Sequence, residues 1–388
     1  MIQAAYFHIP FCAQICHYCD FNKVFFQNQP VDEYLQAMEK EMKHTVETFQ
    51  MNELRTVFVG GGTPTVLEMN QLEYFLSSIH RYFSLAEDVE FTFEANPDNV
   101  SEEKLRLLKE AGVNRLSFGV QTFDDDLLKR IGRSHTKKEA IQTIELAKKI
   151  GFENINIDLM YGLPTQTFQQ LKETLDIAFS LDVQHFSAYS LIIEPKTVFY
   201  NLMKKKQLSL PSQEEEAEMY EEIMEQMERN GYHQYELSNY AKKGFESRHN
   251  LTYWNNEQYY GIGAGAHSYV AGRRNANAGP IKKYIELVEE NGLPYIESHM
   301  VTRVEQMEEE MFLGLRKTEG VCKKVFEKKY ACSMEDVFGK QIEEQKQNGL
   351  LEETNDYIRL THRGKLLGNE VFQAFIGAID NETNLDIS

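Results

Sequence analysis

Three cysteines, Cys12, Cys16 and Cys19, lie within eight residues in the pattern C-x3-C-x2-C. Thiolates are the usual protein ligands of iron–sulfur clusters, and one tight loop can place three of them on three corners of a cubane. A cubane has four irons, so one iron stays open to a chelating molecule. S-adenosylmethionine can chelate such an iron, and an injected electron then cleaves its sulfonium bond. The pattern therefore predicts a [4Fe–4S] cluster that works with S-adenosylmethionine.

The same cysteines also fit a different metal site. Together with His8 or His17 they could form a Cys3His zinc site, in which protein ligands fill all four positions of the metal. Aromatic residues on both sides of the motif would shield a cluster from water, but they would serve equally well as ordinary core residues. The spacing by itself leaves both kinds of site open.

Further along the chain, polar or glycine-rich groups follow the predicted strands. The run Gly60-Gly61-Gly62-Thr63 lets backbone approach a ligand closely, although a simple tight turn would use the same residues. The other polar groups are Glu94, Gln121, Arg133 and Asp158. Each alone is more often a capping or surface residue. Together they predict a site for a zwitterion, because carboxylates bind ammonium and hydroxyl groups and a guanidinium binds a carboxylate.

Alternating strands and helices must position these groups. The expected strands are about 4–9, 55–60, 89–94, 114–119, 154–159 and 183–191. The expected helices are near 31–49, 68–83, 101–110, 136–150 and 167–180. Such alternation predicts βα units and a parallel sheet, whose chemistry lies at the carboxyl ends of the strands. We expect an α/β fold with a partial (β/α)6 barrel of the TIM type, and a doubly wound sheet is the alternative.

The second half of the chain has a different pattern. After a polar crossover, a helix is expected over 213–230, and the Tyr-, Gly- and Asn-rich stretch 232–300 is expected to be irregular. From about 303 we expect three helices, a hairpin around Asn355-Asp356 and a last helix near 362–376. These elements predict a smaller, winged-helix-like α+β domain. The expected division is a barrel over 1–195, a crossover and irregular region over 196–300, and this C-terminal domain over 301–388.

Composition excludes several classes of protein. The 388 residues carry 41 basic and 60 acidic side chains, and a net charge of −19 argues against a nucleic-acid partner. No apolar run approaches the roughly 18 residues of a transmembrane helix, and the first residues do not form a signal-peptide pattern. The five cysteines are an odd number, of which Cys322 and Cys332 are expected to be structural. These features predict a cytoplasmic protein.

The sequence resembles the radical SAM superfamily. The resemblance rests on YFHIPFCAQICHYCDF (6–21), GGGTPT (60–65), FEANP (93–97), SFGVQTF (117–123), DLMYGLP (158–164) and HNLTYWNNEQYYGIGAGAHSY (249–269). It is similar in particular to the branch that holds the oxygen-independent coproporphyrinogen III dehydrogenases of porphyrin biosynthesis and the HemW group of heme chaperones. The resemblance covers almost the whole chain and implies a partial barrel with a C-terminal helical domain.

The resemblance also implies roles for individual residues. It makes Cys12, Cys16 and Cys19 the ligands of the [4Fe–4S] cluster. The residues implied to contact S-adenosylmethionine are Tyr6, Tyr18, Gly61, Gly62, Thr63, Glu94, Gln121, Arg133, Asp158 and Ile192.

One position separates the two groups of that branch. The pattern that the resemblance implies for the dehydrogenases is C-x3-C-x2-C-x-C, with a fourth cysteine. In this chain the residue at that fourth position is Phe21. The stretch from His249 to Trp254 resembles the H-N-x-x-Y-W pattern associated with heme binding in the chaperones. Both features favour a heme chaperone that delivers heme to a hemoprotein acceptor, in solution or at a membrane, and that could act as a homodimer. The alternative is the dehydrogenase, which decarboxylates coproporphyrinogen III to protoporphyrinogen.

The chemistry of the H-N-x-x-Y-W stretch allows heme binding. A neutral imidazole such as that of His249 suits heme iron, and Tyr253 and Trp254 could stack on a porphyrin face. His267 is a second candidate for the axial ligand. A purely structural role, with the histidine capping a turn and the aromatic rings packed inside the protein, is the other interpretation.

Overall fold

A computed structural model describes residues 2–49 and 52–379. Its contacts divide the chain into two compact units. The first unit comprises Met1–His233, Tyr240–His249 and Gln258–His299. The second comprises Gln234–Asn239, Asn250–Glu257 and Met300–Ser388.

The main sheet carries the barrel. Its strands are β1 (Ala4–Ile9), β4 (Leu54–Gly61), β5 (Leu85–Ala95), β6 (Arg115–Gln121), β7 (Asn154–Tyr161), β8 (His185–Ser190), β9 (His233–Glu236), β10 (Asn239–Ala241) and β11 (Tyr260–Ile262). They follow the order β11-β1-β4-β5-β6-β7-β8-β10-β9, and the pairs from β11 to β8 are parallel. From β1 to β8 the spatial order is the chain order. A doubly wound sheet would reverse direction at a switch point, so the expected partial barrel is confirmed.

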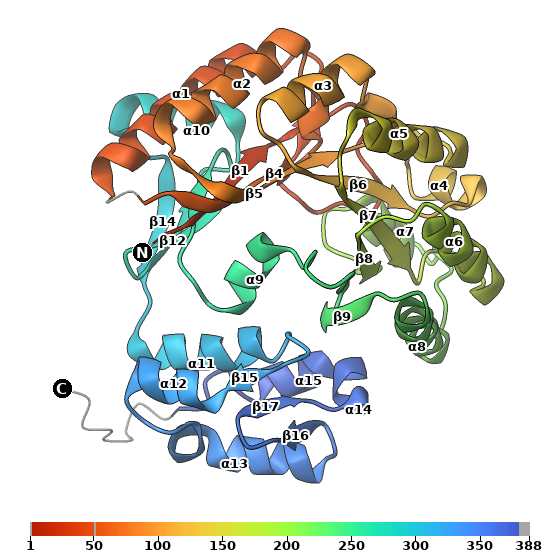
Figure 1. The fold of residues 1–388 in the computed structure, drawn as a ribbon, viewed down its shortest axis with the longest axis vertical. Helices are drawn as coiled ribbons and strands as arrows, with labels where there is room; N and C mark the ends of the chain where they lie inside the picture. The colour runs from red at the N-terminus through yellow and green to blue at the C-terminus, as the bar shows by residue number, and fades with distance from the viewer. Residues whose placement is uncertain (1, 50–51, 380–388) are drawn as a thin grey trace. The chain divides into compact units, whose positions relative to one another are not determined.

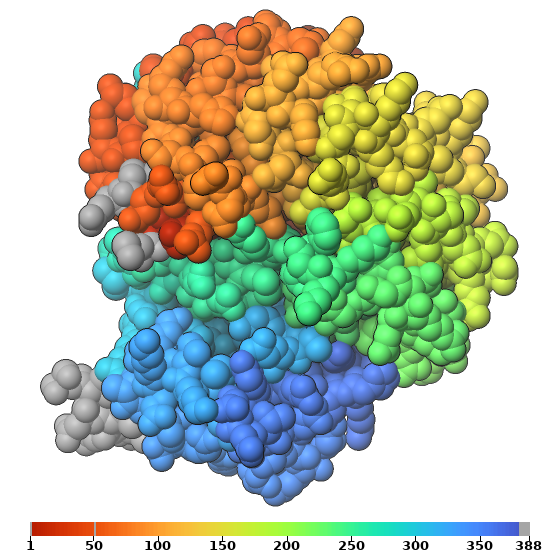
Figure 2. Space-filling view, viewed as in Figure 1, coloured from red at the N-terminus to blue at the C-terminus, as the bar shows by residue number. Residues whose placement is uncertain are grey.

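Helices cover the outer side of the curved sheet (Figure 1). They are α1 (Val31–Thr48), α2 (Met69–Tyr82), α3 (Glu102–Glu110), α4 (Asp125–Arg130), α5 (Lys137–Ile150), α6 (Phe168–Ser180), α7 (Val198–Lys204) and α8 (Gln213–Arg229). Helices α5 and α6 begin with capping boxes, at Thr136 with Glu139 and at Thr167 with Gln170, so their starts were readable from sequence. In the space-filling view the segments that carry these helices, orange through yellow to green, form the rim of the unit on the side shown (Figure 2).

Apolar and polar side chains alternate along the strands, so that one face of the sheet forms the core and the other face carries the polar groups. On β5 the side chains of Phe91 and Phe93 are fully buried, and Glu94 projects to the opposite side. On β6 the apolar Leu116 alternates with the polar Ser117 in the same way. The apolar side meets the helices, and the polar side faces the interior of the barrel.

Short elements complete the first half. They are β2 (Phe11–Cys12), β3 (Val24–Phe25) and the 3-10 turns η1 (Pro64–Val66) and η2 (Pro97–Asn99). Strands β2 and β3 pair in parallel, with Cys12 opposite Phe25. The cysteine motif therefore begins on a strand and continues into the loop between β2 and β3.

The expectation that 232–300 is irregular was wrong. Besides β9, β10 and β11, it holds α9 (Arg248–Trp254), β12 (His267–Val270), β13 (Arg273–Asn277), α10 (Ile281–Asn291) and β14 (Tyr295–Met300). The glycines that suggested loops instead allow segments of the chain to approach one another closely. At Gly261 on β11, for example, a Cβ would overlap the carbonyl of His267.

The second unit has a small antiparallel sheet, in the order β15-β17-β16, with helices around it. Its elements are α11 (Arg303–Gly314), β15 (Val321–Cys322), α12 (Lys323–Tyr330), α13 (Met334–Gln347), β16 (Leu351–Glu353), β17 (Tyr357–Leu360), α14 (His362–Leu366) and α15 (Gly368–Gln373). Three helices followed by a hairpin confirm the sequence expectation. The last helix differs, because two short helices meet at Leu367.

Among residues 2–49 and 52–379, no helix combines the length and the apolar character that a membrane crossing requires.

Candidate functional site

The three thiols of the motif lie on one loop. Cys12 is buried at the end of β2, and Cys16 and Cys19 are half-buried in the following loop; all three are free. The Thr63 hydroxyl lies 3.7 Å from Cys12 Sγ, and Arg133 Nη1 donates to Cys16 Sγ at 3.2 Å. Burial raises the pKa of the Cys12 thiol to about 11, so binding a cluster there must displace a proton.

The glycine-rich turn after β4 closes against this loop. A Cβ at Gly62 would lie 2.9 Å from Cys12 Sγ and 2.7 Å from the Phe11 carbonyl oxygen, so only glycine fits there. Gly61 has a φ of +115° and donates its N–H to Glu94 Oε2 at 3.1 Å. The turn thus places Gly62 and Thr63 next to the first cysteine, and its Gly61 N–H holds Glu94.

Arg133 fixes another side of the site. Besides Cys16, its guanidinium donates to Asn96 Oδ1 at 2.6 Å and to the Gly119 carbonyl. The Gln121 amide lies beside the same glycine, and Gln121 itself is held at a φ of +70° where β6 ends. The ends of β5 and β6 and the cysteine loop therefore meet at Arg133.

Two carboxylates face the interior of the barrel at this end. Burial and the charge of Asp158 raise the pKa of Glu94 to about 8. Burial also raises the pKa of Asp158, which accepts hydrogen bonds from Asn156 Nδ2 at 2.7 Å and Ser117 Oγ at 3.4 Å. The positive charge of Arg115, on β6, partly offsets the rise in the pKa of both carboxylates.

Three more predicted residues have different surroundings. The Tyr6 hydroxyl bonds His8 Nδ1 at 2.9 Å, and its ring stacks on Phe58. Tyr18 packs against an apolar cluster that includes residues of α4 and α7. Ile192, just past β8, is 66% exposed. Burial, followed by the charge of Glu94, raises the pKa of Tyr6, and burial, followed by the charge of Cys16, raises the pKa of Tyr18. Both hydroxyls therefore lie near groups of the site.

The two histidines of the zinc alternative are engaged elsewhere. His8 bonds Tyr6 through Nδ1 and the Asn22 carbonyl through Nε2. His17 bonds the Arg130 carbonyl through Nδ1, and its ring meets Phe199 edge-on. Within the described part of the chain, no three His, Cys, Asp or Glu side chains form a group that could hold a single metal ion. Both imidazoles thus bond backbone carbonyls, and three thiols on one short loop are a donor set that suits a cubane with one open iron.

The candidate heme residues lie on or near α9. His249 is 1% exposed; its Nδ1 bonds Thr56 Oγ1 at 2.9 Å, and its ring stacks on Phe58 at 5.2 Å. Burial, followed by the Arg115 charge, lowers the pKa of His249 to about 3, so the imidazole is neutral. His267, at the start of β12, is exposed.

The aromatic end of α9 belongs to the second unit. There the guanidinium of Arg316 lies over the Trp254 ring, 4.4 Å from its centre. Trp254 Nε1 is buried and has no hydrogen-bond partner among the described residues. Tyr253 is half-buried. One face of the only tryptophan is therefore occupied by an arginine.

Sequence reasoning missed Arg115. It is 2% exposed, and its Nε has no partner within the described residues. The available signal was its parity: Arg115 stands two residues before Ser117 on a strand whose alternate side chains are apolar. A charged side chain on the interior side of that strand had to lie beneath the carboxylates.

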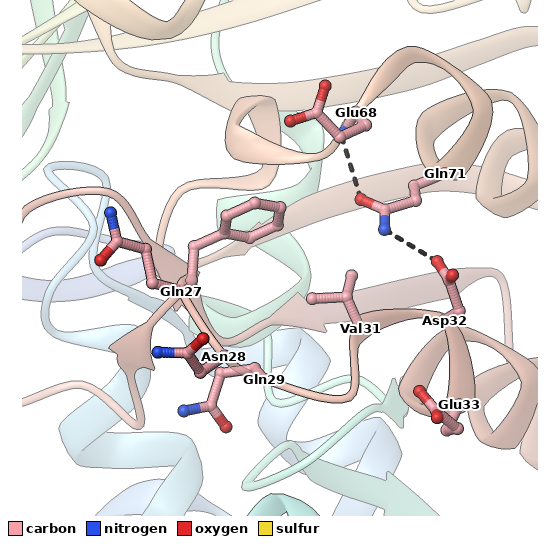
Figure 3. A pocket seen from close by; sticks show the side chains of 9 residues that line it. Gln27, Asn28, Gln29, Val31, Asp32, Glu33, Glu68 and Gln71 are labelled. Atoms are coloured by element: carbon pink, nitrogen blue, oxygen red, sulfur yellow. Dashed lines mark hydrogen bonds between the residues drawn. The ribbon is translucent and has the colours of Figure 1, made fainter.

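A separate cavity lies next to the cysteine loop. It has a volume of about 480 Å³ and is lined by the segment after β3 and the first turns of α1 and α2 (Figure 3). Gln71 links its walls, accepting from the Glu68 N–H and donating to Asp32 (Figure 3). None of the residues predicted from sequence lines this cavity.

Two family models match the chain. Residues 6–178 match the model of the radical SAM superfamily, and residues 301–367 match the model of the HemN C-terminal domain. The solved structure of coproporphyrinogen III oxidase HemN from Escherichia coli, described as a radical SAM enzyme, has a TM-score of 0.85. The match covers 96% of this chain and 90% of that one at 24% identity, and so shows a shared fold.

Curated relatives share more of the sequence. The heme chaperone HemW of Bacillus subtilis (strain 168) is 57% identical over 379 residues, which are 97% of this chain and 100% of the relative. The heme chaperone HemW of Escherichia coli (strain K12) is 35% identical over 375 residues, which are 96% of this chain and 97% of the relative.

Proposed function

The chain belongs to the HemW family of heme chaperones within the radical SAM superfamily, and we propose that it binds heme and transfers it to a hemoprotein acceptor. Proteins of this superfamily use a [4Fe–4S] cluster and S-adenosylmethionine. We assign both cofactors to the mouth of the barrel, by which we mean the cysteine loop, the glycine turn after β4 and Arg133. We assign heme to the region of α9.

One observation carries the cofactor assignment: the cysteine loop is hydrogen-bonded to the glycine turn on one side and to Arg133 on another. When bound, the cluster would supply an open iron for S-adenosylmethionine to chelate and an electron for cleaving its sulfonium bond. The chain's own part is positioning. Cys12, Cys16 and Cys19 would hold the cluster, and Gly62 would let the turn approach it.

The remaining residues would orient S-adenosylmethionine. Its carboxylate would pair with Arg133, and its ammonium or ribose hydroxyls would bond Glu94 or Asp158. The other proposed contacts are Tyr6, Tyr18, Gly61, Thr63, Gln121 and Ile192. Replacing Glu94 or Arg133 by alanine should weaken S-adenosylmethionine binding to the reconstituted protein, and equilibrium dialysis measures it. Unchanged binding in both variants would reject this assignment.

For heme we propose His249 as axial ligand, with Tyr253 and Trp254 against the porphyrin. In the present conformation the His249 ring is enclosed between Thr56 and Phe58, so ligation requires α9 to move away from β4. The exposed His267 needs no such movement and is the second candidate.

A heme titration tests the proposal directly. Purified protein with a rebuilt cluster should give a shifted Soret band when heme is added, and His249→Ala should weaken the shift more than His267→Ala. The reverse ranking would move the axial ligand to His267. Absence of any shift in the wild-type protein would exclude heme binding, and with it the chaperone function.

The alternative function is oxidative decarboxylation of coproporphyrinogen III. The fold shared with HemN favours it, whereas Phe21 stands where the dehydrogenase pattern has a fourth cysteine. Anaerobic incubation with coproporphyrinogen III separates the two functions. We expect no protoporphyrinogen, and its formation would establish the dehydrogenase.

Finer features of the function are also proposals. We propose that the protein works in the cytoplasm as a homodimer, that its acceptor is a hemoprotein in solution or at a membrane, and that it has no nucleic-acid partner. We also propose that residues 1–195 form the radical SAM barrel, that 196–300 form the region that serves heme, and that 301–388 form the smaller C-terminal domain. Sedimentation with and without heme measures the oligomeric state, and a monomer under both conditions would reject the dimer.

A further inference from the structure

The cysteine loop has an attachment that the cofactor assignment does not use. Asn22 follows Cys19 by three residues and is half-buried. Its side-chain Nδ2 donates to the Ala264 carbonyl at 2.8 Å and to the Gly279 carbonyl at 3.0 Å. Its own carbonyl accepts from His8 Nε2 at 2.7 Å. One amide therefore joins the cysteine loop to two segments more than 240 residues further along the chain.

The partner segment is shaped to receive this amide. Gly265 has a φ of +75°, and a Cβ there would lie 2.6 Å from Asn22 Nδ2. Gly263 has a φ of +106°, and a Cβ there would crowd the His8 carbonyl at 2.5 Å. Both positions need glycine for the backbone angle and for the space. We call residues 263–265 the glycine loop.

The glycine loop rests on a buried polar network. The Tyr34 hydroxyl donates to the His8 carbonyl at 2.7 Å and accepts from the Ala264 N–H at 2.9 Å. The Glu41 carboxylate accepts from the Gly263 N–H at 2.9 Å, from Asn277 Nδ2 at 2.7 Å and from a tyrosine hydroxyl of α10. A fully connected network of this kind holds one geometry. The glycine loop is thus a rigid support for the cysteine loop that Asn22 attaches to it.

On its other side the cysteine loop is fixed by His17. The His17 N–H donates to the Ile131 carbonyl at 3.0 Å, and its own carbonyl accepts from the Phe199 N–H at 3.1 Å. Cys19 therefore lies between two attachments, one at His17 and one at Asn22, and Cys16 directly precedes the first. The Cys19 N–H bonds the Cys16 carbonyl at 3.3 Å and so ties the two cysteines together.

We infer that Asn22 is a positioning residue, which holds the cysteine loop on the glycine loop in the shape that receives the cluster. The inference rests on the proposed cluster at Cys12, Cys16 and Cys19. A loop that is already in shape loses less conformational entropy when its thiolates bind, so the cluster is held more tightly. Without the Asn22 bonds, the loop would have to order itself around each cluster it binds.

Two substitutions at Asn22 separate positioning from folding. Asn22→Asp keeps the shape of the side chain but replaces the donor with an acceptor that faces two carbonyl oxygens. Asn22→Ala removes the donor without adding charge. The matched control is Asn70→Asp, an exposed position in the first turn of α2 where a carboxylate is favourable.

Each protein is reconstituted without air, and iron and sulfide per chain, release of iron to a chelator and the EPR spectrum of the reduced cluster are measured. We expect both Asn22 variants to release iron about tenfold faster than the wild type. We also expect their EPR spectra to respond less to added S-adenosylmethionine. In the cluster-free proteins the lost bonds should lower the midpoint of thermal unfolding only slightly relative to the Asn70→Asp control, whereas a merely structural role of Asn22 would lower the midpoint and leave the EPR response to S-adenosylmethionine unchanged.

The outcomes are distinct. Release of iron at the control rate in both Asn22 variants overturns the inference and leaves the proposed function standing. If Asn22→Asp fails to fold, Asn22→Ala decides by the same measurement. A wild-type protein that takes up no iron and sulfide overturns the proposed cluster, and the inference falls with it.

Discussion

The mouth of the barrel and helix α9 hold their functional side chains in different ways. At the mouth, Cys16, Cys19 and Arg133 are half-buried, and their polar atoms point toward one another. On α9, His249 is enclosed against β4, and Trp254 is covered on one face by an arginine. The first region is ready for a cofactor, whereas the second must rearrange before its residues can contact a porphyrin. The predictions below test that difference.

The largest effect is expected at the cysteines. Replacing Cys16 by serine removes one of three ligands from a cluster that has no protein ligand to spare, so bound iron should fall close to zero. The matched control is Cys332→Ser in the second unit, where the sulfur lies near Met307 and iron content should stay at the wild-type value. Iron and sulfide assays after anaerobic reconstitution measure both. A Cys16→Ser protein with full iron content would disprove the three-thiol site.

The next effect concerns the stability of the barrel unit. His249→Ala leaves a cavity beside Phe58 and removes the partner of the Thr56 hydroxyl, which together should lower the free energy of unfolding by about 2–4 kcal/mol. His267→Ala changes an exposed side chain and should leave the free energy of unfolding unchanged. Urea unfolding followed by circular dichroism compares the two variants. Equal stability of both would mean that α9 does not rest on β4 in solution, and heme could then reach His249 directly.

At the mouth, pH should control the affinity for S-adenosylmethionine. The pKa of Glu94 is about 8, so the side chain is neutral at pH 6.5 and charged at pH 9. Affinity should rise about tenfold across this range, because only the carboxylate attracts the cationic ligand. The ammonium group of the ligand titrates nearby, so Glu94→Gln serves as the reference from which the Glu94 contribution is subtracted. A wild-type profile parallel to that of Glu94→Gln would remove Glu94 from the site.

A rise in pH that charges Glu94 should lower the stability of the folded protein, although it favours ligand binding. Because the folded-state pKa of Glu94 lies above the ordinary value of a glutamate, the folded protein holds its proton more tightly than the unfolded chain. The associated stability is complete below about pH 4 and is lost as the pH rises through about 8. The pH conditions that favour S-adenosylmethionine binding therefore cost the empty protein some stability, which the bound ligand can offset.

The mouth of the barrel could be predicted from sequence because its residues follow strand ends. Glu94 stands at the end of β5, and parallel strands bring such ends to one edge. Asp158 was expected at a strand end, but it lies in the middle of β7, which runs on to Tyr161. Glycines at 61 and 62 carried a second signal, since close approach requires them. Local pattern and tertiary position agree in this region.

The surroundings of α9 could not be predicted in the same way. Nothing near His249 in sequence indicates that it packs on Thr56 and Phe58, which precede it by more than 190 residues. Arg115 and Asn22 were missed for the same reason, since their roles depend on which distant segments they meet. A motif identifies the side chain, but only the fold determines whether its atoms are open to a ligand.

The smallest expected effect concerns the aromatic end of α9. If Trp254 stacks on heme, the guanidinium of Arg316 must first leave its face, and that stack is worth about 0.5–1 kcal/mol. Arg316→Lys keeps a cation near the buried Glu236 but has no planar group to stack, so heme should bind about twofold to fivefold more tightly. The matched control is Arg274→Lys, which removes a similar stack over Tyr269 in the first unit and should not change heme affinity. Weaker heme binding in Arg316→Lys would mean that the arginine helps to hold heme, and equal binding would mean that heme does not use this face of Trp254.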